Sequence, residues 1–136
     1  MPFPEIKHCL IADSVRPEAF GKVTLLGFFG VAPDVSINVK NFANPLELGF
    51  LLLGGTGDAA GTIQFQLVDS NSQVLVATPP GTVQMASDGK RMSSALGITH
   101  RYAGPGRYAL RLVLDGKPHY DAWFELLQGQ PQHFQG

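Results

Sequence analysis

The hairpin over residues 104–127 constrains the fold of this chain more than any other stretch. Apolar side chains alternate along 108–114, and a period of two is typical of a strand with one buried face. Asp115 and Gly116 follow, a pair that readily adopts the positive φ angles of a tight turn. A second run, 119–127, returns beside the first. The pattern predicts antiparallel sheet structure with a defined inward face.

Strand signals recur along the whole chain and are separated by Gly, Pro, Asn and Asp. This spacing is typical of sandwiches and barrels, and no helical period is sustained beyond a short turn at 16–20. In the run 62–68, Ile63, Phe65 and Leu67 are expected to point inward. The expected strands are residues 6–12, 23–29, 35–39, 46–53, 62–68, 74–77, 82–86, 92–102, 108–114 and 119–127.

Two apolar runs lack polar alternates, namely 25–29 and 49–53. A strand covered on both faces has this composition, and so does a strand whose apolar outer face docks onto a partner. The sequence leaves both interpretations open.

The length of 136 residues fits one domain, since a chain of this size buries about 70% of its unfolded surface. We expect a single sandwich domain over 1–127 and a polar, frayed tail over 128–136. The lone cysteine excludes an internal disulfide, and the first residues do not resemble a secretory signal, so the expected location is the cytoplasm. No apolar run approaches the roughly 18 residues of a membrane helix.

The net charge of −1 and a pI near 6.4 argue against binding to nucleic acid or to an anionic membrane. The charges are nevertheless unevenly placed. Residues 41–89 hold acids but no Lys or Arg, whereas 90–111 hold five bases and no acid. The two blocks either face each other across neighbouring strands, remain solvated, or form complementary surfaces for self-association.

The element from Gly106 to Tyr108 resembles the tyrosine corner of immunoglobulin-like sandwiches. Leu110 stands where antibody domains have a cysteine, and the only tryptophan, Trp123, lies on the last strand. With the motifs at 10–13, 21–27, 65–69 and 114–116, the order resembles an uncharacterised bacterial β-sandwich family, a domain of unknown function, over roughly 9–127. That resemblance implies a fold and no activity.

Two loops have compositions that resemble those of ligand-binding loops. Within Gly54–Gly61, the residues Gly55, Gly57 and Gly61 give GxGxxxG without a following Lys-Ser/Thr, so the segment predicts an inter-strand loop rather than a phosphate-binding loop. Asp69–Gln73 places oxygen atoms at alternate positions, as calcium loops do, but lacks their glycine and closing glutamate, so it predicts an Asx turn. A calcium site would need Asp13 or Asp115 as well.

A catalytic or metal site would have to be assembled from distant residues. His119 and Asp121 are two apart on an expected strand, and two ligands do not complete a zinc site. Cys9 alternates with Ile11 on another strand, and a buried thiol is inert. We therefore expect no enzyme, and we assign no catalytic, metal or cofactor-binding residue.

The sequence predicts an all-β, antiparallel two-sheet sandwich, immunoglobulin-like in architecture, with a jelly roll or C2-like topology as the alternative. The expected function is a non-catalytic interaction or scaffold module of the bacterial cytoplasm. We expect it to form a homo-oligomer through an apolar sheet face or an exposed edge, and we expect Arg107, Arg111 and His119 to be the residues of a surface for a protein partner. Two alternatives remain: a sandwich that binds calcium or carbohydrate, and an enzyme whose site combines Cys9, His100, His119 and Asp121.

Overall fold

The computed structural model describes residues 5–19, 22–56, 60–84 and 91–129, and these form an all-β protein. No helix among them is long and apolar enough to cross a membrane. The strands are β1 (Ile6–Pro17), β2 (Val23–Val31), β3 (Ser36–Val39), β4 (Leu46–Thr56), β5 (Ala60–Asp69), β6 (Val74–Ala77), β7 (Gly81–Gln84), β8 (Arg91–His100), β9 (Gly106–Leu114) and β10 (Lys117–Gln128).

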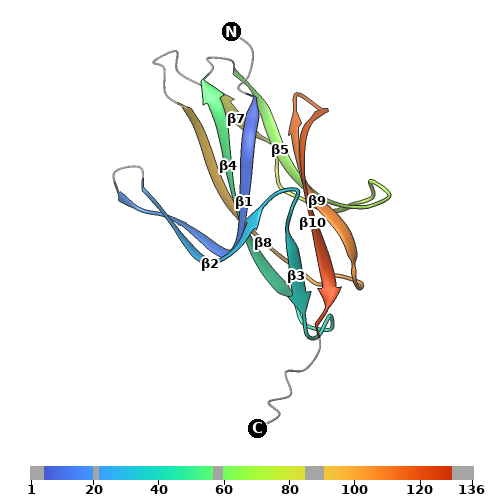
Figure 1. Cartoon of the computed structure of the whole chain (residues 1–136). Helices are drawn as coiled ribbons and strands as arrows, with labels where there is room; N and C mark the ends of the chain where they lie inside the picture. The colour runs from blue at the N-terminus through green and yellow to red at the C-terminus, as the bar shows by residue number, and fades with distance from the viewer. Residues whose placement is uncertain (1–4, 20–21, 57–59, 85–90, 130–136) are drawn as a thin grey trace.

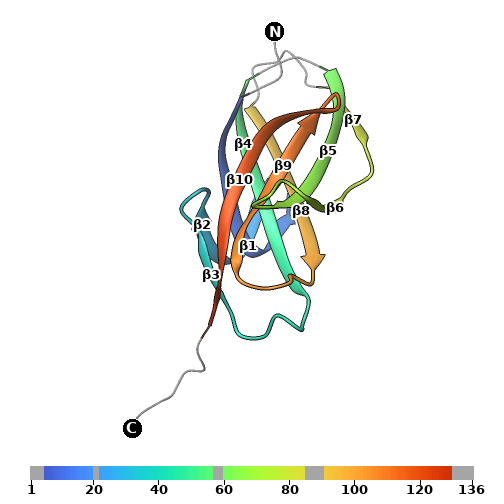
Figure 2. The ribbon, with the colours of Figure 1, turned by 90° about the vertical axis from the view of Figure 1, so that its right-hand side faces the viewer.

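The strands form two sheets that face each other (Figure 1). The four-stranded sheet has the order β2-β1-β4-β8. The six-stranded sheet has the order β3-β10-β9-β5-β6, and β7 also pairs with β5. Figure 2 shows the two layers from the side of the six-stranded sheet. The predicted two-sheet, all-β fold is thereby confirmed.

All ten expected strands are present, and the differences lie at their ends. The first strand continues to Pro17 rather than ending at Ala12, because its second half pairs with β2. The expectation of purely antiparallel sheets is wrong in one place, since β3 runs parallel to β10. The chain crosses from the four-stranded sheet to the six-stranded sheet between β2 and β3. Strand β3 then runs beside β10 in the same direction (Figure 1). The expected tail begins inside β10, and residues 130–136 lie outside the described part of the chain.

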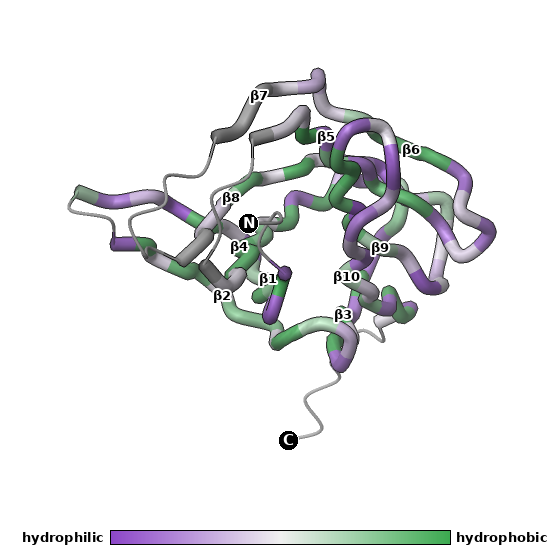
Figure 3. The backbone as a smooth tube through the Cα atoms, turned by 90° about the horizontal axis from the view of Figure 1, so that it is seen from above, coloured by the Kyte–Doolittle hydropathy of each residue, from purple (hydrophilic) through white to green (hydrophobic). Residues whose placement is uncertain are grey.

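The core lies between the sheets and is built from the inward positions of both. Phe50 on β4 and Phe124 on β10 are its two largest fully buried side chains, and their ring centroids are 5.9 Å apart. Such aromatic pairs add attraction beyond the area they bury. The other fully buried side chains are Ile11, Ile37, Leu48, Leu52, Leu67, Leu110, Leu112, Leu126 and Val68. Figure 3 shows this apolar composition along the strands from above.

The alternation that predicted β9 holds in the structure, because Tyr108, Leu110 and Leu112 are all buried in the core. The hydroxyl of Tyr108 also donates a hydrogen bond of 2.7 Å to the carbonyl oxygen of Gly104. The turn that follows has positive φ angles at both central residues, 51° at Asp115 and 80° at Gly116. The closing hairpin therefore forms as predicted.

The distal halves of β1 and β2 form a two-stranded ribbon that projects away from the body (Figure 1). The first strand pairs with β4 only through Ala12, whereas its pairing with β2 continues to Pro17. A Cβ atom on Gly49 would lie 2.6 Å from the Val15 nitrogen, so only a glycine allows β1 to pass so closely. Because Leu48 and Phe50 point into the core, Gly49 faces the opposite side, where the ribbon departs.

A bulge at the base of the ribbon separates two neighbouring phenylalanines. The register between β1 and β2 shifts by one residue beyond Ile11, which leaves Phe29 as the extra residue on β2. Phe29 packs against the core, whereas 55% of Phe28 is exposed. A bulge of this kind redirects side chains, and here it turns one aromatic ring outward.

Candidate functional site

The outer face of β9 and β10 carries an ordered set of charged side chains. Arg111 on β9 and Asp121 on β10 are directly paired across the strands. The Arg111 Nε donates to Asp121 Oδ1 at 2.8 Å, and Nη2 donates to Oδ2 at 3.2 Å. This hydrogen bond raises the pKa of the Arg111 guanidinium. A bidentate pair of this kind fixes both side chains in place.

Four residues before Arg111 on β9, Arg107 lies over the ring of Trp123, with its Cζ atom 5.2 Å from the ring centroid. Glu125 is the residue paired with Arg107 on the neighbouring strand. Among the residues that the structure describes, the ion pairs are Glu5–Lys7 and Arg111–Asp121. Arg107 therefore rests on an aromatic face without a carboxylate partner, and its guanidinium remains available to a ligand.

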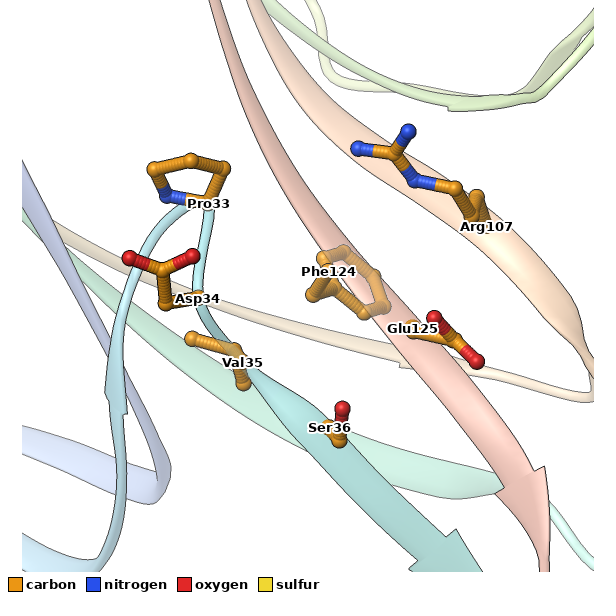
Figure 4. Close-up of a pocket in the computed structure, with 7 residues that line it drawn as sticks. All are labelled: Pro33, Asp34, Val35, Ser36, Arg107, Phe124 and Glu125. Atoms are coloured by element: carbon orange, nitrogen blue, oxygen red, sulfur yellow. The ribbon is translucent and has the colours of Figure 1, made fainter.

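A pocket of about 420 Å³ opens beside Arg107 (Figure 4). Its walls come from two regions that are distant in sequence, the connection between β2 and β3 and the paired strands β9 and β10. The parallel pairing of β3 with β10 brings them together, and the Glu125 nitrogen donates to the Val35 oxygen at 2.9 Å. The lining residues are Pro33, Asp34, Val35, Ser36, Arg107, Phe124 and Glu125.

The structure places the three residues of the predicted interaction surface, Arg107, Arg111 and His119, on the neighbouring strands β9 and β10. Arg107 and Arg111 lie on one face of β9, as the period of two requires. His119 is exposed at the far end of the hairpin, beside the register shift between Pro118 and Tyr120. The acidic block over 41–89 does not supply the ionic partner of Arg111, which is Asp121 instead.

The sequence did not single out Asp34, Ser36 or Glu125 as site residues. Glu125 could have been found, because it alternates with Trp123 on a strand that was predicted. Asp34 and Ser36 reach the pocket through the parallel pairing of β3 with β10. No local pattern signals such a contact, since it joins segments almost ninety residues apart.

The residues of the enzyme alternative are held by separate structural elements. Cys9 is fully buried on β1, His100 ends β8, and Asp121 is bound to Arg111. Within the described ranges, no group of three His, Cys, Asp or Glu side chains could hold a metal ion. His119, the fourth residue of that alternative, is exposed on β10.

Burial of Cys9 leads to a testable expectation. Desolvation raises the pKa of its thiol from 9.0 to about 12, so the reactive thiolate is scarce in the folded protein at pH 8. We expect no reaction with a thiol-specific chromogenic reagent until denaturant is added, and then one thiol per chain. The Cys9 thiol ionises at a lower pH in the unfolded chain than in the folded protein. Its ionisation therefore lowers the free energy of unfolding as the pH rises from about 9 to about 12. Rapid labelling of the native protein would contradict this placement.

The loop candidates behave as turns where the structure describes them. Asp69 Oδ1 accepts hydrogen bonds of 2.9 Å from the nitrogens of Asn71 and Gln73, which confirms the predicted Asx turn. Asp115 Oδ1 accepts a hydrogen bond from the Thr62 nitrogen, and the Asp13 carboxylate lies against Gly27. The glycine-rich segment 54–61 includes residues 57–59, which lie outside the described residues.

A second, smaller pocket of about 230 Å³ lies where β8 ends and β9 begins. Tyr102 contributes to its lining, is only 3% exposed, and has a hydroxyl without a hydrogen-bond partner in the described part of the chain. Burial raises the pKa of this hydroxyl, which therefore stays protonated. The ring of His100 lies edge-on to Tyr102 at 5.0 Å, and burial lowers the pKa of its imidazole.

An apolar surface on β2 forms the other candidate. Five large apolar side chains are exposed among the described residues, and three of them lie on this strand. They are Leu26 at 42%, Phe28 at 55% and Val31 at 39% exposure. Because β2 ends the four-stranded sheet, its outer edge is not paired with another described strand. We name this strand, with its three exposed side chains, the β2 edge.

No family model and no curated protein matches the chain. One similar solved structure is the alkylpurine DNA glycosylase AlkC of Pseudomonas fluorescens bound to DNA containing an abasic site analog. The two sequences are 18% identical, the match covers 71% of this chain and 28% of the glycosylase chain, and the TM-score is 0.40. Another is a glycosyl hydrolase family 2 member from Bacteroides cellulosilyticus DSM 14838, 9% identical over 88% of this chain and 26% of its own, with a TM-score of 0.41. The chain spans about a quarter of the length of each, and likenesses this low carry no argument about its activity.

Proposed function

We propose that this chain is a non-catalytic interaction module that associates with a second copy of itself through the β2 edge. The composition of this strand carries the proposal. Its nine residues include no charged residue and no proline, and three of its large apolar side chains are exposed. Proteins usually protect edge strands with charges, prolines or short length, and the β2 edge has none of these.

The proposal includes an immunoglobulin-like sandwich. In that architecture strands A, B and E are neighbours in one sheet, while G, F, C and C′ are neighbours in the other. The orders β1-β4-β8 and β10-β9-β5-β6 follow the same sequence of strands. The hydrogen bond from Tyr108, near the start of β9, to Gly104 supports a tyrosine corner at the expected place. The β1–β2 ribbon is then an addition to the edge of the sheet formed by A, B and E.

Charge and symmetry favour a second copy as the partner. Antiparallel pairing of two β2 strands about a twofold axis would join the same surface of both copies, as isologous dimers require. Since neither strand carries a charge, the approach meets no like-charge repulsion. The pairing would also support the ribbon, because an isolated two-stranded hairpin is only marginally stable. A lone, buried Cys9 fits a reducing compartment such as the bacterial cytoplasm.

The test is the mass of the protein in solution as a function of concentration. Light scattering is expected to show a dimer that dissociates on dilution, and Phe28→Glu is expected to give a monomer, because pairing would bring two carboxylates together. Phe28 is mostly exposed, so the variant retains its fold.

Val74→Glu is the matched control, since Val74 is another exposed apolar residue, at 46%, and lies on the outer strand β6 of the other sheet. It is expected to dimerise like the unmodified protein. A monomer at every concentration of the unmodified protein would refute the proposal, as would dimers of undiminished stability in Phe28→Glu.

A further inference from the structure

We propose that the pocket beside Arg107 binds a small zwitterion that carries an ammonium and a carboxylate group, such as a free α-amino acid. The pocket is lined by the β2–β3 connection and by β3, β9 and β10, and its lining includes no residue of the β2 edge. The inference therefore stands or falls independently of self-association.

The size and floor of the pocket suit a small molecule. Its volume of about 420 Å³ falls in the range of roughly 300–1,000 Å³ that is typical of ligand sites. Val35 and Phe124 are 2% and 1% exposed and form part of the core, so this side of the pocket is rigid. The polar side chains stand around these apolar residues (Figure 4).

The charges around the pocket are of both signs and are separated. Figure 4 shows the Asp34 carboxylate beside Pro33, with the Arg107 guanidinium on the other side of Phe124 and Glu125 on a third side. In the part of the chain that the structure describes, the ion pairs are Glu5–Lys7 and Arg111–Asp121, and they use none of these three groups. Two carboxylates and one guanidinium are thus available to a ligand.

This arrangement discriminates among ligand classes. An anion attracted by Arg107 would also meet two carboxylates, and a cation held by the carboxylates would meet Arg107. A dipolar ligand places its ammonium near Asp34 and Glu125 and its carboxylate near Arg107, so that each charge lies near an opposite one. Charge-assisted hydrogen bonds of this kind are about twice as strong as neutral ones, which favours a zwitterion over a neutral sugar.

The groups that would contact the ligand are positioned before it binds. The Trp123 ring supports the Arg107 guanidinium at 5.2 Å. The Asp34 nitrogen donates to the Val31 oxygen at 3.1 Å, and the Glu125 nitrogen donates to the Val35 oxygen at 2.9 Å, which anchors both backbone segments. Preorganisation of this kind lowers the entropy cost of binding. Ser36 adds a hydroxyl that can donate or accept.

Ligand-observed saturation-transfer NMR tests the inference, with the standard L-amino acids as probes and with acetate, ethylamine and glucose as single-function controls. At least one amino acid is expected to receive saturation, and the three controls are not. Asp34→Asn and Arg107→Gln each remove one charge from an exposed side chain and are expected to weaken that binding by about tenfold or more.

Glu47→Gln and Arg101→Gln are matched controls, because they remove the same charges from exposed residues outside the pocket and are expected to leave binding unchanged. Saturation of glucose but of no amino acid would replace the inference with a carbohydrate site. Saturation of no probe, or binding that survives both pocket variants, would overturn it. The light-scattering result decides self-association separately, so the two failures cannot be confused.

Discussion

Phe50→Ala is expected to lower the free energy of unfolding by about 3–5 kcal/mol, as truncations of fully buried phenylalanines do. Phe50 is 0% exposed on the central strand β4, and its ring packs against Phe124 of the opposite sheet. The variant loses the transfer free energy of the ring and leaves a cavity that the two rigid sheets cannot close. Because native domains are stable by only about 5–15 kcal/mol, this single change removes a large part of the total.

Phe28→Ala is the control, since it makes the same chemical change at a residue that is 55% exposed. In the monomer it is expected to change the free energy of unfolding by about 0.5 kcal/mol or less. Urea unfolding of both variants measures the difference, at a protein concentration low enough for the dimer to be dissociated. Equal losses in the two variants would mean that the Phe50–Phe124 contact does not hold the sheets together.

The local features of the fold were predictable because they follow from short-range patterns. A period of two predicts a strand and its inward face from a few residues, which is why the ten strands and the buried positions of β9 were found. The turn at Asp115 and Gly116, the Asx turn at Asp69 and the hydrogen bond of Tyr108 to Gly104 also involve neighbours in sequence. Each of these needs only local information.

The register of the closing hairpin could not be predicted, because a bulge changes it. Leu114 pairs with Lys117, and continued without interruption this register would pair Arg111 with Tyr120. The shift between Pro118 and Tyr120 pairs Arg111 with Asp121 instead. A shift of one residue exchanges the two faces of a strand, so the bulge decides that Asp121, and not Tyr120, is the partner of Arg111.

The pocket and the ribbon depend on contacts between distant segments. Nothing in the residues around Asp34 indicates that β3 will run parallel to β10, and the pocket exists only because it does. The stretch from Asp13 to Pro17 lacks a strand pattern and extends only by pairing with β2. Tertiary pairing overrides the weak local preference of such a segment. The candidate site therefore required the structure, whereas the fold class did not.

Gly49→Ala is the second large expected effect, and it tests how the ribbon leaves the sheet. The added Cβ would lie 2.6 Å from the Val15 nitrogen and 2.9 Å from the Ser14 carbonyl carbon, which are backbone atoms that no rotamer change can move. We expect a loss of about 1–3 kcal/mol or more in the free energy of unfolding, because β1 must shift to admit the methyl group.

Gly97→Ala provides the contrast, since Gly97 is paired directly with Gly49 on the neighbouring strand. There the nearest atom to an added Cβ is the Leu48 oxygen, at 3.9 Å, so the methyl group fits without strain. The same change is expected to stabilise the fold by about 0.4–1 kcal/mol, because alanine lowers the conformational entropy of the unfolded chain. Urea unfolding measures both effects. If β1 shifts in Gly49→Ala, the β2 edge moves with it, so this variant is also expected to weaken self-association whereas Gly97→Ala is not. Identical stabilities of the two variants would show that β1 does not pass over Gly49.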